Sequence, residues 1–294
     1  MSEAEGGAGR ELVVVRAGAL TTVQDLGRLG HAHLGVPRAG ALDQAAHRLA
    51  NRLLGNPADA AALETTLDGC AVRARGGAMR VVVGGAPCPV AVDGRPAAWG
   101  EPVTVPDGAV LEVGPVTAGV RCAVAVAGGI AVPAVLGSRS TDLLSGLGPR
   151  QAVAGDVLPC GPAPSDPPPL ADALPWAAPP RELVLPLRWG PRQDWFAPQA
   201  RGLLLRARYT VSAQSNRIGL RLDGPPLGRA REGELPSEGM VLGAVQVPSD
   251  GRPVLFLADH PTTGGYPVVG VVDESALSAA AQAAPGTPVR FVTA

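Results

Sequence analysis

Short apolar runs broken by glycine turns dominate this sequence and constrain its fold more than any other feature. Valine-rich segments alternate with small or polar residues and end at DG or GG pairs, as in residues 79–85, 89–97, 101–114 and 120–130. Period-two alternation between tight turns is typical of β-strands and hairpins. Because aromatic residues make up only 3% of the chain, the cores must consist of Val, Leu and Ala. We therefore predict a mainly β fold, with two β-barrel-like domains and a few short helices.

A proline- and alanine-rich stretch divides the chain. Residues 161–182, GPAPSDPPPLADALPWAAPPRE, cannot hold a sheet ladder or a helix interior and predict a semi-rigid linker. The linker separates an N-terminal domain at 11–160 from a C-terminal domain at 183–294. Residues 1–10 are acidic and glycine-rich, so we expect a disordered lead-in and not a signal peptide. No run approaches the roughly 18 apolar residues that span a bilayer, so we expect a cytoplasmic protein with no membrane partner.

The basic residues and cysteines exclude several kinds of chemistry. All 25 basic residues are arginines, so a Schiff-base lysine, a Walker A phosphate loop and a biotinylated lysine cannot occur on this chain. The net charge is −1 and no basic stripe is interleaved with aromatics, which argues against a nucleic-acid partner. Cys70, Cys88, Cys122 and Cys160 are scattered and are expected to be small core residues in a reducing compartment.

One segment has the pattern of an amphipathic helix. Apolar residues recur at a spacing of 3.6 between Asp43, a suitable N-cap, and the stop signals Gly55 and Pro57. The opposite side has His47 and Asn51, which we interpret as a solvated face.

Three polar, glycine-punctuated segments lie between the strong strands, where scaffolds often display functional side chains. In the first, residues 20–30, Gln24, Asp25 and Arg28 place an amide, a carboxylate and a guanidinium close together. Arg28 and the later Arg38 have the fork geometry that binds a carboxylate or a phosphate. The alternative is a plain ion pair of Asp25 with Arg28 across a turn.

The second segment, residues 125–148, contains the turn GSRST at 137–141. Its backbone amides, hydroxyls and guanidinium have the chemistry of an anion cradle. The segment is not a dinucleotide fingerprint, because the third glycine and a following long helix are missing. An ordinary Ser/Gly turn is the alternative.

The third segment, residues 254–272, combines the most polar groups in one loop. A buried strand leads into Asp259 and His260 and then into PTTGGYP at 261–267, and an upstream strand end adds SNR at 215–217. Adjacent residues on a strand point to opposite faces, so a direct relay between Asp259 and His260 is not expected. The pair HAH at 31–33 lacks a third clustered ligand, and we predict no metal site.

Six segments along the chain follow an order that is characteristic of one known family. They are LTTVQDLGRLG, GVPRAGALD, LANRLLGNP, VAVAGGIAVPAVLGSRST, VSAQSNRIGLRLDG and DHPTTGGYPVVGVV. With them the chain resembles the family of 5-oxoprolinase C subunits, also named KipA, allophanate hydrolase subunit 2 and biotin-dependent carboxyltransferase family protein. The resemblance extends over roughly residues 12–292. It implies two cyclophilin-like β-barrel domains.

The resemblance also implies that the protein is one component of a larger enzyme. The implied partners are a KipI-like protein and a LamB/YcsF-type protein, which are the B and A subunits of 5-oxoprolinase. The three together cleave the lactam 5-oxo-L-proline to L-glutamate. The implied chemistry uses ATP to phosphorylate the lactam oxygen, which makes the ring an electrophile that water can attack. ATP is implied as shared with the KipI-like partner, Mg²⁺ is left open, and ring opening is associated with the LamB/YcsF-type partner.

The polar segments that carry the resemblance supply the predicted site. The predicted catalytic residues are Asp259, Arg28 and Arg217. The predicted substrate-binding residues are Gln24, Asp25, Ser215, Asn216, Thr262, Thr263, Gly264, Gly265 and Tyr266. Arginine would bind phosphate or carboxylate, threonine hydroxyls and glycine amides would bind lactam or phosphoryl oxygens, and the aspartate would act as a polar orienter.

Two other functions stay open. One is the carboxyltransferase half of a biotin-dependent, urea-carboxylase-like enzyme, in which biotin would have to arrive on a partner chain because this chain has no lysine. The other is a regulatory antagonist that binds a KipI-like kinase inhibitor without turnover. The sequence also departs from the family at Pro261, where glutamine often occurs, and at Leu220, where an aromatic residue is common. Loss of the amide at position 261 puts the role of that side chain in question.

Overall fold

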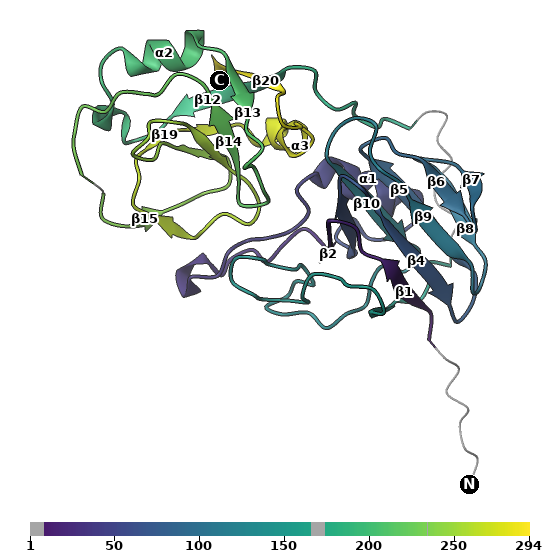
Figure 1. The fold of residues 1–294 in the computed structure, drawn as a ribbon. Coiled ribbons are helices and arrows are strands. Elements are labelled where there is room, and N and C mark those ends of the chain that lie inside the picture. The colour runs from purple at the N-terminus through teal and green to yellow at the C-terminus, as the bar shows by residue number, and fades with distance from the viewer. Residues whose placement is uncertain (1–8, 166–173, 234) are drawn as a thin grey trace.

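Strands dominate the computed structural model, which describes residues 9–165, 174–233 and 235–294. The mainly β class predicted from the sequence is confirmed (Figure 1). Of the predicted lead-in, all but residues 9 and 10 lie outside the described residues. Within the described ranges, no helix combines the length and the apolar character needed to cross a membrane.

Two antiparallel sheets form the first half of the chain and enclose one core. The six-stranded sheet has the order β11-β1-β4-β9-β6-β7. Its strands are β1 (Glu11–Arg16), β4 (Cys70–Arg75), β6 (Val90–Val92), β7 (Arg95–Ala97), β9 (Val110–Val113) and β11 (Val157–Pro159). The five-stranded sheet has the order β2-β3-β10-β5-β8. Its strands are β2 (Leu20–Gln24), β3 (Ala62–Thr66), β5 (Met79–Gly85), β8 (Pro102–Val105) and β10 (Arg121–Val126). Val, Leu and the buried free thiols of Cys70, Cys88 and Cys122 fill the space between the sheets, as predicted, whereas Cys160, also expected in the core, is half-buried and packs against it.

The helix α1 (Gln44–Leu53) covers part of the outer face of the five-stranded sheet. It begins as predicted, with the Asp43 side chain accepting a hydrogen bond from the Ala46 N–H at 3.0 Å. The prediction of a solvated face at His47 and Asn51 is wrong, because both side chains are buried. The chain after the helix folds back over this face, and Asn51 Nδ2 donates to the Ala60 carbonyl at 2.8 Å. Burial also lowers the pKa of His47.

The second half of the chain closes into a barrel with the order β12-β19-β16-β17-β14-β13-β20. Its strands are β12 (Leu183–Trp189), β13 (Tyr209–Val211), β14 (Gly219–Asp223), β16 (Ala244–Gln246), β17 (Val254–Phe256), β19 (Val268–Val272) and β20 (Pro288–Thr293). Only β12 and β20 pair in parallel among the strand pairs of the described barrel. A separate two-stranded sheet joins β15 (Glu238–Gly239) to β18 (Thr263–Gly264). The remaining helical elements are α2 (Ala200–Arg206), α3 (Leu277–Ala281), η1 (Ala32–Leu34), η2 (Gln193–Trp195) and η3 (Glu274–Ala276).

The two halves lie side by side, and two long loops of the first half, residues 25–43 and 127–156, run below their junction (Figure 1). Gln282, just after α3, fastens the halves together. Its Oε1 accepts from the Arg121 N–H at 3.1 Å, and its Nε2 donates to Asp43 Oδ2 at 2.8 Å. The start of β10 and the N-cap of α1 are therefore both held by the second half.

Part of the predicted linker packs on the first half of the chain. Residues 166–173 lie outside the described residues. Beyond them, the indole of Trp176 lies 5.6 Å from that of Trp99, centroid to centroid, and donates to the Gly100 carbonyl at 3.0 Å. The same indole covers Gly84, where an added Cβ would lie 2.0 Å from the ring.

Replacement of Gly84 by alanine should displace the Trp176 ring and lower the free energy of unfolding by about 1–3 kcal/mol. In a Trp176→Ala background the same replacement should cost little, because the clash is gone. Urea unfolding of the double-mutant cycle measures this coupling. Gly239→Ala, which has open space around its Cβ, is the control and should change stability by less than about 0.5 kcal/mol. If Gly84→Ala lowers the free energy of unfolding equally in the wild-type and Trp176→Ala backgrounds, the packing of the Trp176 indole on Gly84 is wrong.

Candidate functional site

The outer face of the five-stranded sheet is polar where α1 leaves it uncovered. The strand register places Thr22 opposite Glu64 and Thr66 opposite Arg121. Residues that are paired or two apart share a face, so these four side chains all point outward, away from the core. Glu64 and Arg121 are nevertheless buried, because the second half of the chain covers them.

A single guanidinium joins the two halves at this face. Arg217, which precedes β14, donates from Nε to Asp259 Oδ2 at 2.9 Å and from Nη2 to Asp259 Oδ1 at 3.1 Å. From the first half, Glu64 pairs with its Nη1, and the Gly40 carbonyl accepts from Nη2 at 2.7 Å. All three charged side chains are at most 7% exposed. Two residues predicted to be catalytic, Arg217 and Asp259, thus form a buried ion pair that Glu64 completes.

A second arginine makes this cluster electrically neutral. Arg121 Nε lies 3.8 Å from Glu64 Oε1, and its Nη1 donates to the Ala281 carbonyl. Burial lowers the pKa of Arg121 to about 10, so it stays protonated at neutral pH. Burial also acts to lower the pKa of Arg217, but Glu64 and Asp259 outweigh it and the net shift is upward. Burial raises the pKa of Asp259, and Arg217 opposes that rise.

A cavity of about 270 Å³ extends from this cluster along the junction of the two halves. Its polar lining includes Arg121, Arg217, Asp259, Ser215 and Asn216. Its apolar walls come from both halves and include Leu20, Val120, Leu143, Ile218, Leu220 and Pro285. Apolar walls with a few convergent polar groups are typical of small-molecule sites. The structure therefore brings the predicted residues 215–217 and 259 together in one cavity.

The predicted anion cradle at 137–141 holds a carboxylate of the protein itself. Asp25 Oδ1 accepts from the hydroxyls of Ser138 and Ser140, each at 2.6 Å, and Oδ2 accepts from the Arg139 N–H at 2.6 Å. Burial acts to raise the pKa of Asp25, but these hydrogen bonds and one from Gly27 outweigh it, so the pKa is lowered. Asp25 thereby fastens the loop 25–43 to the loop 127–156.

Arg28 and Gln24 also contact this turn and are buried. Arg28 donates from Nη2 to the Ser140 carbonyl at 2.5 Å, and no ion pair joins it to Asp25 within the described structure. Gln24 Nε2 donates to the Thr141 carbonyl at 3.1 Å. The expected alternative, a plain Asp25–Arg28 pair, is therefore not what the structure shows.

The loop at 261–267 follows the cavity residue Asp259 but makes its contacts elsewhere. Thr263 and Gly264 form β18, which pairs with β15, and the Gly265 carbonyl accepts from the Leu235 N–H at 2.9 Å. The ring of Tyr266 lies 5.8 Å from the guanidinium of Arg229. None of residues 262–266 is among those that line the 270 Å³ cavity. Their assignment to the substrate stays a prediction.

Asp259 and His260 point to different surroundings, as strand alternation leads one to expect. Asp259 binds Arg217, whereas the imidazole of His260 stacks on Phe256 with a centroid distance of 5.9 Å. Burial lowers the pKa of His260. The two side chains therefore do not form a relay.

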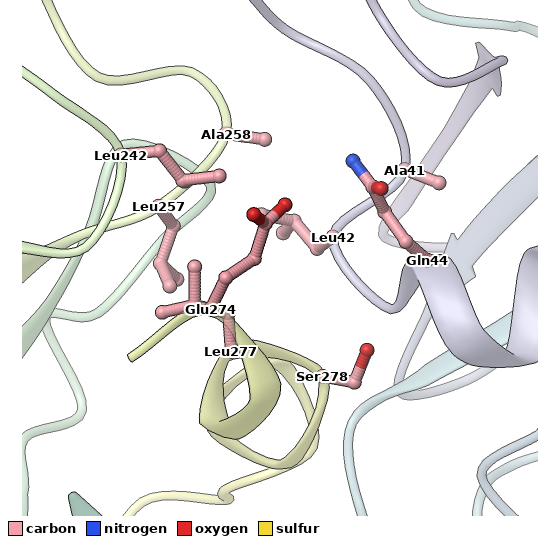
Figure 2. Close-up of a pocket in the computed structure, with 9 residues that line it drawn as sticks. All are labelled: Ala41, Leu42, Gln44, Leu242, Leu257, Ala258, Glu274, Leu277 and Ser278. Carbon is pink, nitrogen blue, oxygen red and sulfur yellow. The ribbon is translucent and has the colours of Figure 1, made fainter. Parts of the chain in front are cut away.

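A second pocket between the halves is too small for a substrate. It has a volume of about 40 Å³, which holds a few water molecules at most. Figure 2 shows Gln44 from the first half and Glu274 from the second on either side of it, with Leu42, Leu257 and Leu277 as apolar lining.

Sequence reasoning missed Glu64 and Arg121, which complete the charged cluster. Each is a charged residue in a strand that is otherwise apolar or uncharged, ALETT and RCAVAV. A charge on a buried strand usually has a partner, so this signal was present in the sequence. Among the described residues, no group of three or more His, Cys, Asp or Glu side chains is placed to hold a metal ion.

Known proteins are similar to this chain over most of its length. The family model of the carboxyltransferase domain, subdomain A and B, matches residues 34–293. The C subunit of 5-oxoprolinase from Escherichia coli (strain K12) is 38% identical over 286 residues, which cover 96% of this chain and 90% of that protein. Urea amidolyase of Lachancea kluyveri is 35% identical over 95% of this chain but only 17% of that protein. The resemblance inferred from the six segments is confirmed.

Two solved structures share the fold over almost the whole chain. The K. lactis urea amidolyase structure superposes with a TM-score of 0.89 at 32% identity, over 96% of this chain and 18% of that chain. The structure of TTHA0988 superposes with a TM-score of 0.87 at 36% identity, over 98% of this chain and 57% of that chain. In both structures the region equivalent to this chain is part of a longer chain.

Replacement of Arg217 by methionine should leave Asp259 and Glu64 buried without their shared counter-charge. We expect the free energy of unfolding to fall by about 3–5 kcal/mol. Because the lost contacts join the two halves, calorimetry should also resolve two transitions in place of one. Arg208→Met, which removes an exposed pair with Glu182, is the control and should cost less than about 1 kcal/mol. A single transition at the wild-type temperature for Arg217→Met would refute this role.

Replacement of Asp25 by asparagine should lower the free energy of unfolding at pH 7 by about 2 kcal/mol, because hydrogen bonds to a charged acceptor are lost. The lowered pKa means that the stabilisation is present above the unfolded-state pKa of about 3.9 and is lost as the pH falls through the folded-state pKa. The stability difference between wild type and variant should therefore shrink below about pH 4. Urea unfolding at pH 7 and pH 3 measures this stability difference. If the difference is the same at both pH values, the Asp25 carboxylate is not the stabilising acceptor.

Proposed function

Because the chain belongs to the carboxyltransferase domain family, subdomain A and B, we propose that it is the C subunit of an ATP-dependent 5-oxoprolinase. In this proposal it works with a KipI-like partner and a LamB/YcsF-type partner, the B and A subunits, to cleave 5-oxo-L-proline to L-glutamate. The four cysteines are all free, which supports a complex that acts in the reducing cytoplasm.

Sequence identity to proteins named as 5-oxoprolinase C subunits, 38% in the E. coli protein, supports this proposal most directly. The chain corresponds to 90% of the E. coli protein named as a 5-oxoprolinase C subunit, and to 87% of its Haemophilus influenzae namesake at 32% identity. Against urea amidolyase it corresponds to 17% of the protein.

The cavity between the halves is the site that the proposal assigns to the lactam. Its volume of about 270 Å³ lies near the lower end of the range for small-molecule pockets, about 300–1,000 Å³. The apolar walls would pack against the ring methylenes, while Asn216, Arg121 and Asp259 offer polar groups to the ring substituents. In this role Arg217 is a positioning residue that holds Asp259 toward the cavity.

Among the described residues, the charged groups that line this cavity do not favour ATP there. A triphosphate needs surplus positive charge, but Arg121 and Arg217 are balanced by Glu64 and Asp259. We therefore assign ATP, and Mg²⁺ if the reaction uses it, to a site shared with the KipI-like partner. What this chain supplies is the binding and orientation of the lactam and the exclusion of water from it.

The fold also supports a second function. The observation that favours it is the superposition on urea amidolyase over 96% of this chain, with a TM-score of 0.89. A carboxyltransferase role would place the accepting amide in the same cavity. Since the chain has no lysine, biotin would have to be carried by a partner chain.

Co-expression with the KipI-like and LamB/YcsF-type proteins tests the proposed function. The measurement is 5-oxoproline-dependent release of ADP and glutamate, with each of the three proteins omitted in turn. We expect turnover only when all three are present. A stable complex of this chain with the KipI-like protein that never turns over 5-oxoproline, even with the third protein added, would overturn the proposal. Transfer of a carboxyl group from a biotinylated partner to urea would support the second function.

Leu143→Trp should fill the cavity without disturbing the fold, because Leu143 lines the cavity and is 44% exposed. We expect turnover by the assembled enzyme to fall more than about tenfold, since orientation of the substrate is lost, with an unchanged unfolding midpoint. Leu144→Trp is the matched control, because Leu144 is 45% exposed and is not among the cavity-lining residues. Equal turnover by the two variants would exclude the cavity as the lactam site.

A further inference from the structure

Two buried thiols of the first half lie in contact and take no part in the proposed site. Cys122 Sγ, on β10, lies 3.7 Å from Cys88 Sγ, in the segment that follows β5. Among the described cysteines, no other pair of thiols is in hydrogen-bond contact. The S–S bond of a disulfide is about 2.05 Å long, so the two sulfurs would have to approach each other by less than about 2 Å to form one.

The path of the backbone keeps the two residues together. β10 pairs with β5 in antiparallel register, and Cys122 lies opposite the last residue of β5. The next residue, Ala86, stays against β10, because its N–H donates to the Arg121 carbonyl at 2.8 Å. The carbonyls of the prolines on either side of Cys88 accept hydrogen bonds from the turn at 114–117, at 2.8 and 2.9 Å. The contact between the thiols therefore follows from the fold of the sheet.

The two thiols differ in their surroundings. Cys88 is 8% exposed and lies between the half-buried Pro87 and the exposed Pro89, whereas Cys122 is 0% exposed. The Cys122 thiol has one hydrogen, which can point to the Ala86 carbonyl at 3.3 Å or to Cys88 Sγ. The hydrogen bond from Cys122 lowers the pKa of the Cys88 thiol. The same contact, together with burial, raises the pKa of Cys122. Cys88 is therefore the thiol that is closer to solvent and ionises more easily.

A pair of this kind can be oxidised in two steps. We propose that Cys88 and Cys122 form a reversible oxidation site, at which hydrogen peroxide converts the two thiols into a disulfide. The Cys88 thiolate attacks a peroxide oxygen, the O–O bond breaks, and the departing hydroxide takes up the proton that Cys88 had released, which leaves a sulfenic acid on Cys88. Cys122 then attacks that sulfur: the S–S bond forms, the S–O bond breaks, and the second hydroxide leaves with the Cys122 proton as water. In total, two thiols and one peroxide give a disulfide and two waters, and two electrons pass from sulfur to oxygen.

The other two cysteines lack one or both of these features. Cys70 is 0% exposed, and burial raises the pKa of its thiol to about 12. Cys160 is half-buried and the most exposed of the four, but its Sγ contacts the Leu158 carbonyl and no thiol of the described chain. Burial raises the pKa of Cys160 to about 11. Exposure alone would select Cys160 for oxidation, whereas the geometry selects Cys88 and Cys122.

The disulfide would lie beside the junction of the two halves. Cys122 directly follows Arg121, whose carbonyl accepts from Gln282 Nε2 at 2.9 Å and whose side chain lines the cavity. A bond to Cys88 would fix this end of β10, to which the second half is fastened. The bond joins residues that are 34 positions apart, which restricts the unfolded chain. We therefore expect oxidation to raise the midpoint of thermal unfolding by about 4 °C or more.

Mass spectrometry of the full chain after treatment with hydrogen peroxide tests the proposal. The protein is denatured, its remaining thiols are alkylated with N-ethylmaleimide, and its peptides are mapped. We expect linked peptides that contain Cys88 and Cys122 and have lost two hydrogens, with Cys70 and Cys160 alkylated. Dithiothreitol should reverse both the link and the rise in the unfolding midpoint. Oxidation of Cys160 while Cys88 and Cys122 remain thiols would overturn the proposal. A disulfide that leaves the midpoint unchanged or lowers it would overturn the stabilising effect on β10.

Cys122→Ala separates the two oxidation steps. Without the second thiol, Cys88 should stop at the sulfenic acid, which dimedone traps, whereas the wild type should form the disulfide and give no adduct. Cys160→Ala is the matched control and should form the disulfide as the wild type does. Cys88→Ala, which changes a residue outside the strands, should abolish the response of the unfolding midpoint to peroxide. If Cys88→Ala responds to peroxide as the wild type does, the proposal is wrong. All these measurements are made on this chain alone, so they do not depend on the proposed function.

Discussion

The arrangement of the two halves depends on one buried guanidinium. Arg217 lies where three groups from different parts of the chain converge: Asp259 from its own half, and Glu64 and the Gly40 carbonyl from the other. Removing these charges from water is costly, and the cost is offset only when both carboxylates and the carbonyl are in place. The contact therefore favours one relative orientation of the halves. That orientation creates the cavity, because the walls come from both sides of the junction.

A second buried carboxylate, that of Asp25, holds together the loops 25–43 and 127–156 of the first half. Asp25 binds the turn at 138–140 with short hydrogen bonds, so the turn that has the chemistry of an anion cradle is already occupied. With Asp25 satisfied in this way, Arg28 Nη1 and Gln24 Oε1 have no hydrogen-bond partner among the described residues. The two acidic residues thus have different roles. Asp259 lines the cavity, whereas Asp25 joins the loop 25–43 to the loop 127–156.

Local patterns predicted the elements well, and long-range partners poorly. The β class, the capped helix at 44–53, the core cysteines and the divergence of Asp259 from His260 all follow from spacing and alternation. The burial of His47 and Asn51 does not, because it results from a later segment that folds back over the helix. The pairing of Arg217 with Glu64 spans 153 residues, and nothing in the local sequence of either residue specifies the other. Resemblance to a family grouped residues 215–217 with 259, and it also included residues 262–266, of which Thr263 and Gly264 pair with β15 and none lines the cavity.

The sequence by itself determined the strand-rich fold, the absence of lysine chemistry and the set of polar residues from which a site could be built. Alternation, turn residues and composition act over a few residues, and they are readable without a structure. The tertiary structure alone decided which of these residues meet, which charges neutralise each other and which polar atoms are left without a partner. These outcomes depend on burial and on contacts between distant segments. The pKa and the role of a carboxylate are set by the groups that surround it after folding.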